Sequence, residues 1–268
     1  MLVWCVYCQE FQGEKPPFAD LSITHGICAQ CRAKSRSSLE EDIGQARRLQ
    51  EIQRKLMDVG KRGDIKAAKE IVTTALLSGV RCVDILIGVI APLLYTVGAE
   101  WEQGKVSVEQ EHQFTSFCEN IFQFLSAASN RSDPVIKNRT DPKVLVLNGD
   151  GNHHTLGVRI LAMSLKSKGF SAREFTSMPQ PAKLLRVCQE LRPIAVLVSL
   201  TLAEQREGVL SVIDTLNSCT NVRTKVVVGG YAVKMGLVAE IPGAQLVANI
   251  TDLVDLLRLL SQKGQTEI

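Results

Sequence analysis

Three short runs of apolar residues in the second half of the chain, at positions 144–147, 194–200 and 225–228, alternate with stretches of helical periodicity. A strand that is apolar at every position buries both of its faces, which requires a sheet covered by helices on both sides. Strand–helix alternation of this kind indicates a parallel sheet. We therefore predict that residues 143–268 form a Rossmann-like (flavodoxin-like) doubly wound α/β domain, with its ligand site at the carboxyl ends of the strands.

The preceding region, residues 36–131, instead has apolar residues at helical spacing, interrupted by glycines. Four consecutive helices with short connections are predicted, and helices joined in this way pack as an antiparallel bundle. A polar segment with two prolines, residues 132–142, is predicted to be a linker between the bundle and the α/β domain. The four helices are expected at about 36–61, 65–77, 83–102 and 107–130.

The composition is ordinary for a globular protein, with 45% apolar and 22% charged residues. The net charge is only +3, without a block of Lys and Arg or a helix-turn-helix signature, so direct sequence-specific binding to DNA is not expected. The longest apolar stretch, residues 85–99, is shorter than a bilayer-spanning helix, and the amino-terminus lacks the pattern of a signal peptide. We therefore expect a cytoplasmic protein that does not contact a membrane.

The first 35 residues have little periodicity but contain two Cys-x2-Cys pairs. In a cytosolic chain such pairs bind zinc more often than they form disulfides, and a tetrahedral metal supplies stability that so short a segment lacks. We predict a zinc-ribbon-like module at residues 1–35. His25 could replace a thiolate or only donate a hydrogen bond, and we expect the latter. The pattern leaves open whether the module contacts a partner or DNA or is purely structural. The predicted zinc ligands are Cys5, Cys8, Cys28 and Cys31. The other cysteines, expected to be small buried apolar residues, are Cys82, Cys118, Cys188 and Cys219.

The loop between the first predicted strand of the α/β domain and the helix that follows it carries His153 and His154. Imidazole is a good ligand for a borderline transition metal such as cobalt. Polar and small residues follow the next two strands, where Ser199-Leu200-Thr201 and Gly229-Gly230 stand. Taken singly, a histidine pair is usually a polar loop element and Gly-Gly a common turn.

Together with Asn152-His153-His154-Thr155-Leu156-Gly157, these segments resemble the cobalamin-binding module of the CarH/LitR-like photoreceptor and sensor family, and also AerR-like proteins. The resemblance covers roughly residues 40–262. It implies that His154 binds cobalt from below in place of the cofactor's own dimethylbenzimidazole base, and that Gly157 lets the helix begin close to the inserted nucleotide tail. By the same resemblance Ser199 and Thr201 face that tail, and Gly229-Gly230 leaves room for it.

The end of the third predicted helix and the start of the fourth match the Trp-x9-Glu-His signature of light-sensing cobalamin proteins. The resemblance implies that Trp101 covers the upper ligand of cobalt, with Val108, Glu111 and His112 around it, and that this ligand is an adenosyl group. In some relatives the residue after the Trp is a His that captures cobalt after illumination. Here it is Glu102, so either His112 or water takes that role, or the illuminated state differs from that of those relatives.

The resemblance implies a light sensor that controls transcription through a protein partner or through its own assembly and that is not an enzyme. A corrinoid carrier subunit of a methyltransferase is the alternative, and a cobalamin store or chaperone is a third. Corrinoid methyltransferases have an Asp at the position of Asn152, where it bonds the ligating His and tunes the cobalt. A neutral amide cannot share a proton with the His in that way, which favours the sensor.

Overall fold

The structure, a computed structural model, describes residues 1–8, 10–33, 39–132, 142–219 and 224–266. The chain divides into two compact units, Met1–Val135 and Ile136–Ile268. The second unit is the predicted α/β domain and the first contains the predicted helical bundle together with the cysteine-containing segment.

The α/β unit is built on a five-stranded sheet in the order β5-β4-β6-β7-β8, with every neighbouring pair parallel. The doubly wound, flavodoxin-like prediction is therefore confirmed. The strands are β4 (Lys143–Asn148), β5 (Ser171–Phe175), β6 (Ala195–Ser199), β7 (Lys225–Gly229) and β8 (Ala244–Leu246).

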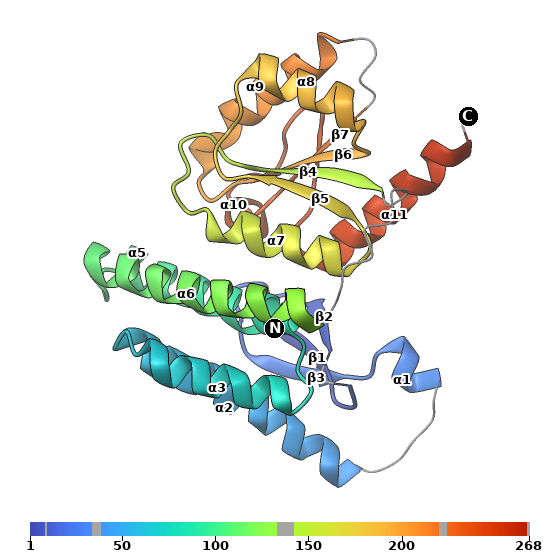
Figure 1. The fold of residues 1–268 in the computed structure, drawn as a ribbon. Coiled ribbons are helices and arrows are strands. Elements are labelled where there is room, and N and C mark those ends of the chain that lie inside the picture. Colours follow the sequence, from blue (N-terminus) through green and yellow to red (C-terminus); the bar gives the residue numbers. More distant parts are fainter. Residues whose placement is uncertain (9, 34–38, 133–141, 220–223, 267–268) are drawn as a thin grey trace. The chain divides into compact units, whose positions relative to one another are not determined.

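Helices cover both faces of this sheet (Figure 1). On one face α7 (Leu156–Ser167) and α11 (Ile250–Thr266) pack against the even-numbered residues of β4, such as Val144 and Val146. The odd-numbered residues, such as Leu145, pack on the opposite face. This two-sided burial explains why β4 is apolar at successive positions. The opposite face is covered by α8 (Pro181–Leu191), α9 (Arg206–Asn217) and the short α10 (Tyr231–Lys234).

The strand order reverses between β4 and β6. From β4 the chain crosses through α7 to β5 at the sheet edge, and then returns through α8 to β6 on the other side of β4. The loops after β4 and β6 therefore lead in opposite directions. Ligands of open α/β sheets usually bind at such a reversal point.

The first unit contains the four predicted bundle helices (Figure 1). The third is continuous through α4 (Cys82–Ile85), the π-helical segment η1 (Leu86–Ile90) and α5 (Ala91–Glu102). The π-helical turns were not predicted from the sequence. The other helices are α2 (Leu39–Lys61), α3 (Ile65–Leu77) and α6 (Val108–Ser132).

This third helix, Cys82–Glu102, is long and apolar enough to cross a membrane, with a mean hydropathy of 2.0, and no other helix among the described residues passes that test. The prediction from sequence considered only the apolar stretch 85–99, and its argument from length does not hold for the whole helix of 21 residues. Burial gives a better account, because Ile85, Leu86 and Ile90 have no exposed surface. An apolar helix of this kind is the expected core helix of a bundle.

A small three-stranded sheet precedes the bundle: β1 (Leu2–Cys5), β2 (Phe11–Glu14) and β3 (Ile23–Gly26), followed by α1 (Ala29–Ala33). The central strand β1 pairs antiparallel with β2 and parallel with β3. Leu2 and Trp4 on β1 are completely buried, so this segment shares a core with the bundle rather than standing apart from it.

Candidate functional site

The loop after β4 begins at Asn148, a polar residue with no exposed surface at the end of a buried strand. Its side-chain Nδ2 donates to the carbonyl oxygens of Asn152 (2.7 Å) and Thr176 (3.1 Å). These two bonds fix the orientation of the amide, so Oδ1 faces Asn152. Asn148 therefore joins the loop after β4 to the loop after β5.

Asn152 connects the loop after β4 to the loop after β6, at the reversal point of the sheet. Its Nδ2 donates to Asn148 Oδ1 and to Thr201 Oγ1, each at 2.9 Å, and its Oδ1 accepts from the backbone N–H of His154 at 2.9 Å. Both hydrogens of the amide are thus engaged. Asn152 holds the backbone of His154 but has no hydrogen bond to either imidazole ring among the described residues.

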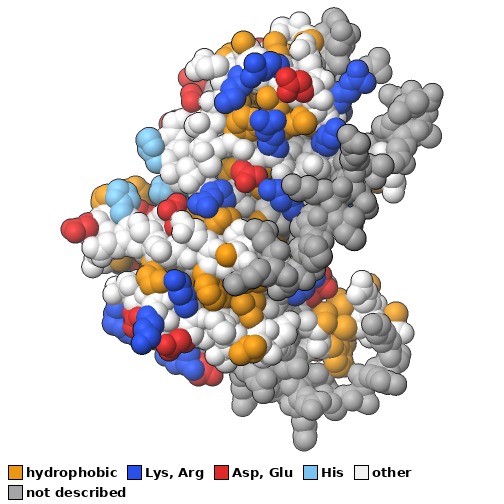
Figure 2. Space-filling view, viewed as in Figure 1, with side chains coloured by type: hydrophobic (Ala, Val, Ile, Leu, Met, Phe, Trp, Pro, Cys, Tyr) orange, Lys and Arg blue, Asp and Glu red, His pale blue; other side chains and the backbone are white. Residues whose placement is uncertain are grey.

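His153 and His154 are exposed, and neither ring has a hydrogen-bond partner in the part of the chain that the structure describes. Figure 2 shows histidine side chains (pale blue) at the molecular surface. A Cβ placed on Gly157, in the first turn of α7, would meet no atom within 4 Å, so the space beside the helix start is open. A free imidazole next to open space at the reversal point of the sheet can ligate a metal.

The close approach of neighbouring loops requires glycine at the two positions that follow the buried part of β7. Gly230 has a φ of +99°, and a Cβ at this position would overlap the carbonyl oxygen of Leu200 and lie 3.0 Å from Ser199 Oγ. A Cβ on Gly229 would lie 3.0 Å from the carbonyl oxygen of Val247. The pair lets the loops after β6 and β7 approach closely, which brings it next to Ser199.

Gln205 is a site residue that the sequence analysis missed. Its side chain is nearly buried, and Oε1 accepts from the backbone N–H groups of Thr201 (2.8 Å) and Leu202 (3.1 Å). The same oxygen would lie 2.9 Å from a Cβ on Gly149, so it also requires a glycine in the facing loop. A glutamine three residues after the start of a helical turn is the one local signal of this role.

The residues predicted around the upper ligand all lie in the first unit, at the end of α5 and the start of α6. Trp101 and Val108 are about half exposed. Glu111 points inward and accepts from Thr115 Oγ1 at 2.8 Å, whereas the His112 side chain is 70% exposed. His112 Nε2 and Glu111 Oε2 are 3.6 Å apart.

An open cleft of about 930 Å³ in the same unit brings together only two of these four residues, Val108 and His112. Trp101 and Glu111 do not line it. The cleft lies between α6 and the turn from α2 to α3, and Lys61 on its rim pairs with Glu100 of α5 at 2.9 Å. Its lining residues are Lys61, Arg62, Gly63, Ile65, Val108, Glu109, His112, Gln113, Ser116, Phe117 and Asn120.

The four cysteines of the amino-terminal segment converge, with all sulfurs within 4.8 Å of one another. Cys8 Sγ and Cys28 Sγ are 3.8 Å apart, and bonds of about 2.3 Å to a tetrahedral zinc separate two sulfurs by about 3.8 Å. Burial acts to raise the pKa of Cys5, but hydrogen bonds from backbone N–H groups, Cys28 among them, outweigh it and lower that pKa to about 7. Such bonds stabilise thiolates, the form that binds metal.

His25 is not a member of this cluster. Its Nε2 is buried without a hydrogen-bond partner among the described residues, and burial lowers the pKa of its ring. Of the other cysteines, Cys118 and Cys188 are buried as expected, and burial raises the pKa of Cys188 to about 11. The prediction was wrong for Cys82 and Cys219, which are partly exposed at helix ends.

Comparison with known proteins finds cobalamin-binding domains in both units of the chain. Models of the B12 binding domain match the chain twice, over residues 52–126 and over residues 142–244. A protein of Rhodobacter capsulatus, described as an uncharacterized 20.5 kDa protein in the bchF-crtJ intergenic region, is 28% identical over 159 residues, which are 59% of this chain and 81% of that protein.

The HTH-type transcriptional repressor CarA of Myxococcus xanthus is 29% identical over 169 residues, 62% of this chain. The match spans 54% of the repressor, little more than half its length. Among solved structures, the monomethylamine corrinoid protein of Methanosarcina barkeri has the same fold, with a TM-score of 0.61, 18% identity and coverage of 82% of this chain and 99% of that one. The chain therefore carries both parts of a cobalamin-binding module, a helical part within residues 52–126 and an α/β part within residues 142–244.

Proposed function

We propose that this protein is a cobalamin-dependent sensor of light that uses adenosylcobalamin and regulates transcription through a protein partner or through its own assembly. It is cytoplasmic and turns over no substrate. The partial match to the repressor CarA supports a regulatory role, and the Trp-x9-Glu-His signature at Trp101 and Glu111-His112 supports an alkyl upper ligand.

The observation that carries the proposal is the conformation of the loop after β4, which exposes the His154 side chain. His154 presents an exposed imidazole at the reversal point of the sheet, without a hydrogen-bond partner among the described residues, while Asn152 holds its backbone through the N–H group. A bound cobalamin supplies a cobalt ion and a light-sensitive cobalt–carbon bond. His154 would bind cobalt from below, Gly157 would leave space for the nucleotide tail, and Ser199 and Thr201 would offer hydroxyls to its polar edge.

The hydrogen bonds of Asn152 favour the sensor over a methyltransferase carrier. Both amide hydrogens are engaged by Asn148 and Thr201, and a neutral amide at this position cannot share a proton with the His154 ring as a carboxylate would. The carrier is the second candidate, since the fold is shared with a corrinoid protein. In a carrier, the same His would have to support repeated methyl transfer at cobalt.

We further propose that the cysteine cluster holds one zinc ion. The four sulfurs lie within 4.8 Å of one another, and four thiolates are a sufficient ligand set for a structural zinc site. Metal analysis of protein purified without added zinc is expected to give one zinc per chain.

The deciding experiment is the absorption spectrum of protein reconstituted with adenosylcobalamin, recorded in the dark and after green light. We expect a base-off, His-on spectrum that changes on illumination, accompanied by a change in shape or assembly state in size-exclusion chromatography. Trp101→Ala should reduce the preference for the adenosyl form and leave binding at the lower face largely intact. A light-induced spectral change without any response in shape, assembly or partner binding would contradict the sensor and favour the carrier.

A further inference from the structure

Trp4 of the cysteine-containing segment is seated in the core of the bundle. Its side chain is completely buried and packs edge-on against Phe11, with ring centroids 5.4 Å apart. Both rings lie over Gly88 of the third bundle helix. A Cβ on Gly88 would overlap the indole of Trp4 and lie 2.9 Å from Phe11 Cδ2. The helix therefore needs a glycine at this position to receive the aromatic pair.

Gly88 lies in η1, the π-helical part of that helix. A π-helical turn widens the backbone locally and is frequently found at functional sites. Here the turn faces the two aromatic rings, so the irregular segment and the inserted side chains coincide.

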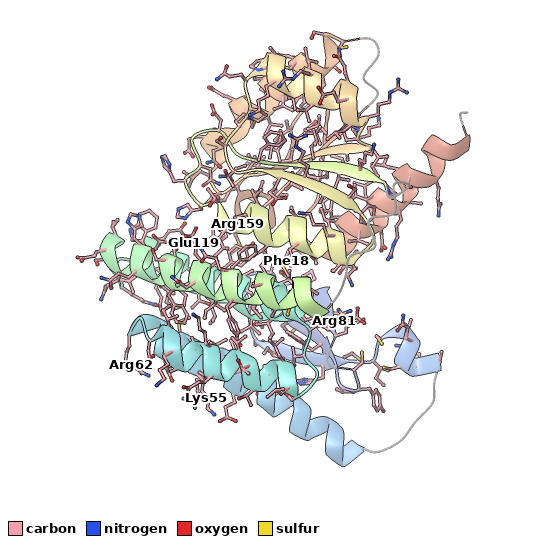
Figure 3. All side chains as sticks on the ribbon, viewed as in Figure 1. Phe18, Lys55, Arg62, Arg81, Glu119 and Arg159 are labelled. Carbon is pink, nitrogen blue, oxygen red and sulfur yellow. The ribbon has the colours of Figure 1, made fainter. Side chains whose placement is uncertain are left out.

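A second contact joins the same two elements. Arg81, at the start of α4, pairs with Glu10 at 2.9 Å and with the buried Asp84 at 2.6 Å. Figure 3 shows Arg81 beside the small amino-terminal sheet. A third contact runs from Gln50 Nε2 of α2 to the carbonyl oxygen of Ile23, at 3.4 Å.

The first two contacts, of Trp4 with Gly88 and of Glu10 with Arg81, involve residues on either side of the first Cys-x2-Cys pair. Trp4 precedes Cys5, and Glu10 follows Cys8 by two residues. A change in the geometry of the cysteine cluster therefore acts on residues next to both contacts. If the four thiolates are not held together by a metal, the backbone between Trp4 and Glu10 keeps the hydrogen bond from the Cys5 N–H to the Glu10 carbonyl oxygen (2.9 Å) but loses the constraint that the metal adds.

We propose that Trp4 is a positioning residue for the third bundle helix. Metal binding by the four thiolates holds the Trp4 side chain against Gly88. From Gly88 the helix continues without interruption to Trp101, a distance of about 20 Å at 1.5 Å per residue. A packed helix moves as a rigid element, so a change at Gly88 reaches Trp101. Metal binding by the cysteine cluster therefore changes the position of Trp101. That this change affects the upper ligand of cobalt rests on the proposed function.

The first test does not involve cobalamin. Gly88→Ala is compared with Gly98→Ala, a matched control on the same helix, where a Cβ would meet no atom within 4 Å. We expect Gly88→Ala to lower the thermal midpoint by about 5 °C or more, because overpacking displaces the aromatic pair, while Gly98→Ala leaves it unchanged or raises it. Chelation of the metal should lower the midpoint of the wild-type protein by a similar amount.

Coupling between the two changes is the critical measurement. If the metal acts through Trp4 and Gly88, chelation should have a much smaller further effect in Gly88→Ala than in wild type or Gly98→Ala, because the contact is already lost. Additive effects, or no effect of chelation on the unfolding of the full-length protein, would overturn the proposal. Trp4→Phe, with its metal content checked, repeats the test with a smaller perturbation.

The second test measures the affinity for adenosylcobalamin relative to hydroxocobalamin in metal-loaded and chelated protein. We expect chelation to reduce this ratio at least about threefold, with hydroxocobalamin binding nearly constant, since the lower face belongs to the other unit. A constant ratio together with coupled unfolding would remove the link to Trp101 but keep the positioning role of Trp4. No cobalamin binding at all would refute the proposed function and leave the first test valid.

Discussion

Replacing Asn152 with Asp exchanges one side-chain nitrogen for oxygen and tests the hydrogen-bond network between the loops after β4 and β6. The wild-type amide donates to Asn148 Oδ1 and Thr201 Oγ1, each at 2.9 Å. A carboxylate can still accept from the His154 N–H, and the Thr201 hydroxyl can rotate to donate to it. Asn148 cannot adapt, because its Nδ2 is held by two carbonyl oxygens.

The cost of this change follows from the one contact that cannot be recovered. The ionised carboxylate places an acceptor against the buried Oδ1 of Asn148, so a hydrogen bond is lost and a buried acceptor is left unpaired. Such a loss costs about 1–3 kcal/mol of unfolding free energy. We expect Asn152→Asp to destabilise the α/β unit by this amount at neutral pH.

Chemical denaturation of the Asn152→Asp protein at several pH values measures the effect. When the introduced carboxyl is protonated it regains a donor for Asn148, so the native state favours its protonated form and raises its pKa above the value in the unfolded chain. The destabilisation is therefore fully present above the raised folded-state pKa, shrinks as the pH falls through that pKa, and changes no further below about 4, the ordinary pKa of Asp. Asn217→Asp, at an exposed position on α9, is the control for the added charge. Equal stability of Asn152→Asp and wild type at neutral pH would refute the network as described.

Three further predictions concern the cofactor, the backbone and the metal. His154→Ala should abolish tight cobalamin binding or leave the spectrum of an unligated lower face, whereas His153→Ala should not; the reverse result would place the ligand one residue earlier. Gly230→Ala should destabilise the protein by about 1–3 kcal/mol in denaturant titrations, because it combines a positive φ with overlap of a backbone oxygen. Cys28→Ser with Cys31→Ser should eliminate bound zinc in metal analysis, and zinc retained by that variant would disprove the assignment.

The fold class and the order of the elements were predictable because they depend on local periodicity. Strands β4, β6 and β7 are apolar at successive positions, and the bundle helices have apolar residues at helical spacing. Strand β5 was not identified individually, because it lies at the sheet edge and only one of its five residues is buried. Burial on both faces leaves a continuous apolar signal, and an exposed edge strand does not.

The candidate ligands were also accessible from sequence, because the residues that bind a metal are specified by chemical type and spacing. The four cysteines and His154 stand in short motifs that can be read without a structure. The functions of their neighbours could not be read in this way. Asn152 acts through Thr201, which is 49 residues away, and the part played by Gln205 depends on Gly149 in a facing loop.

The relation between the cysteine-containing segment and the bundle was decided by tertiary structure alone. Trp4 and Gly88 are 84 positions apart, and neither belongs to a motif. Their contact lies at the π-helical turns of η1, which no periodicity in the sequence predicted. A local pattern reports which side of an element is buried, but the partner that buries it is selected by shape and packing density in the folded chain.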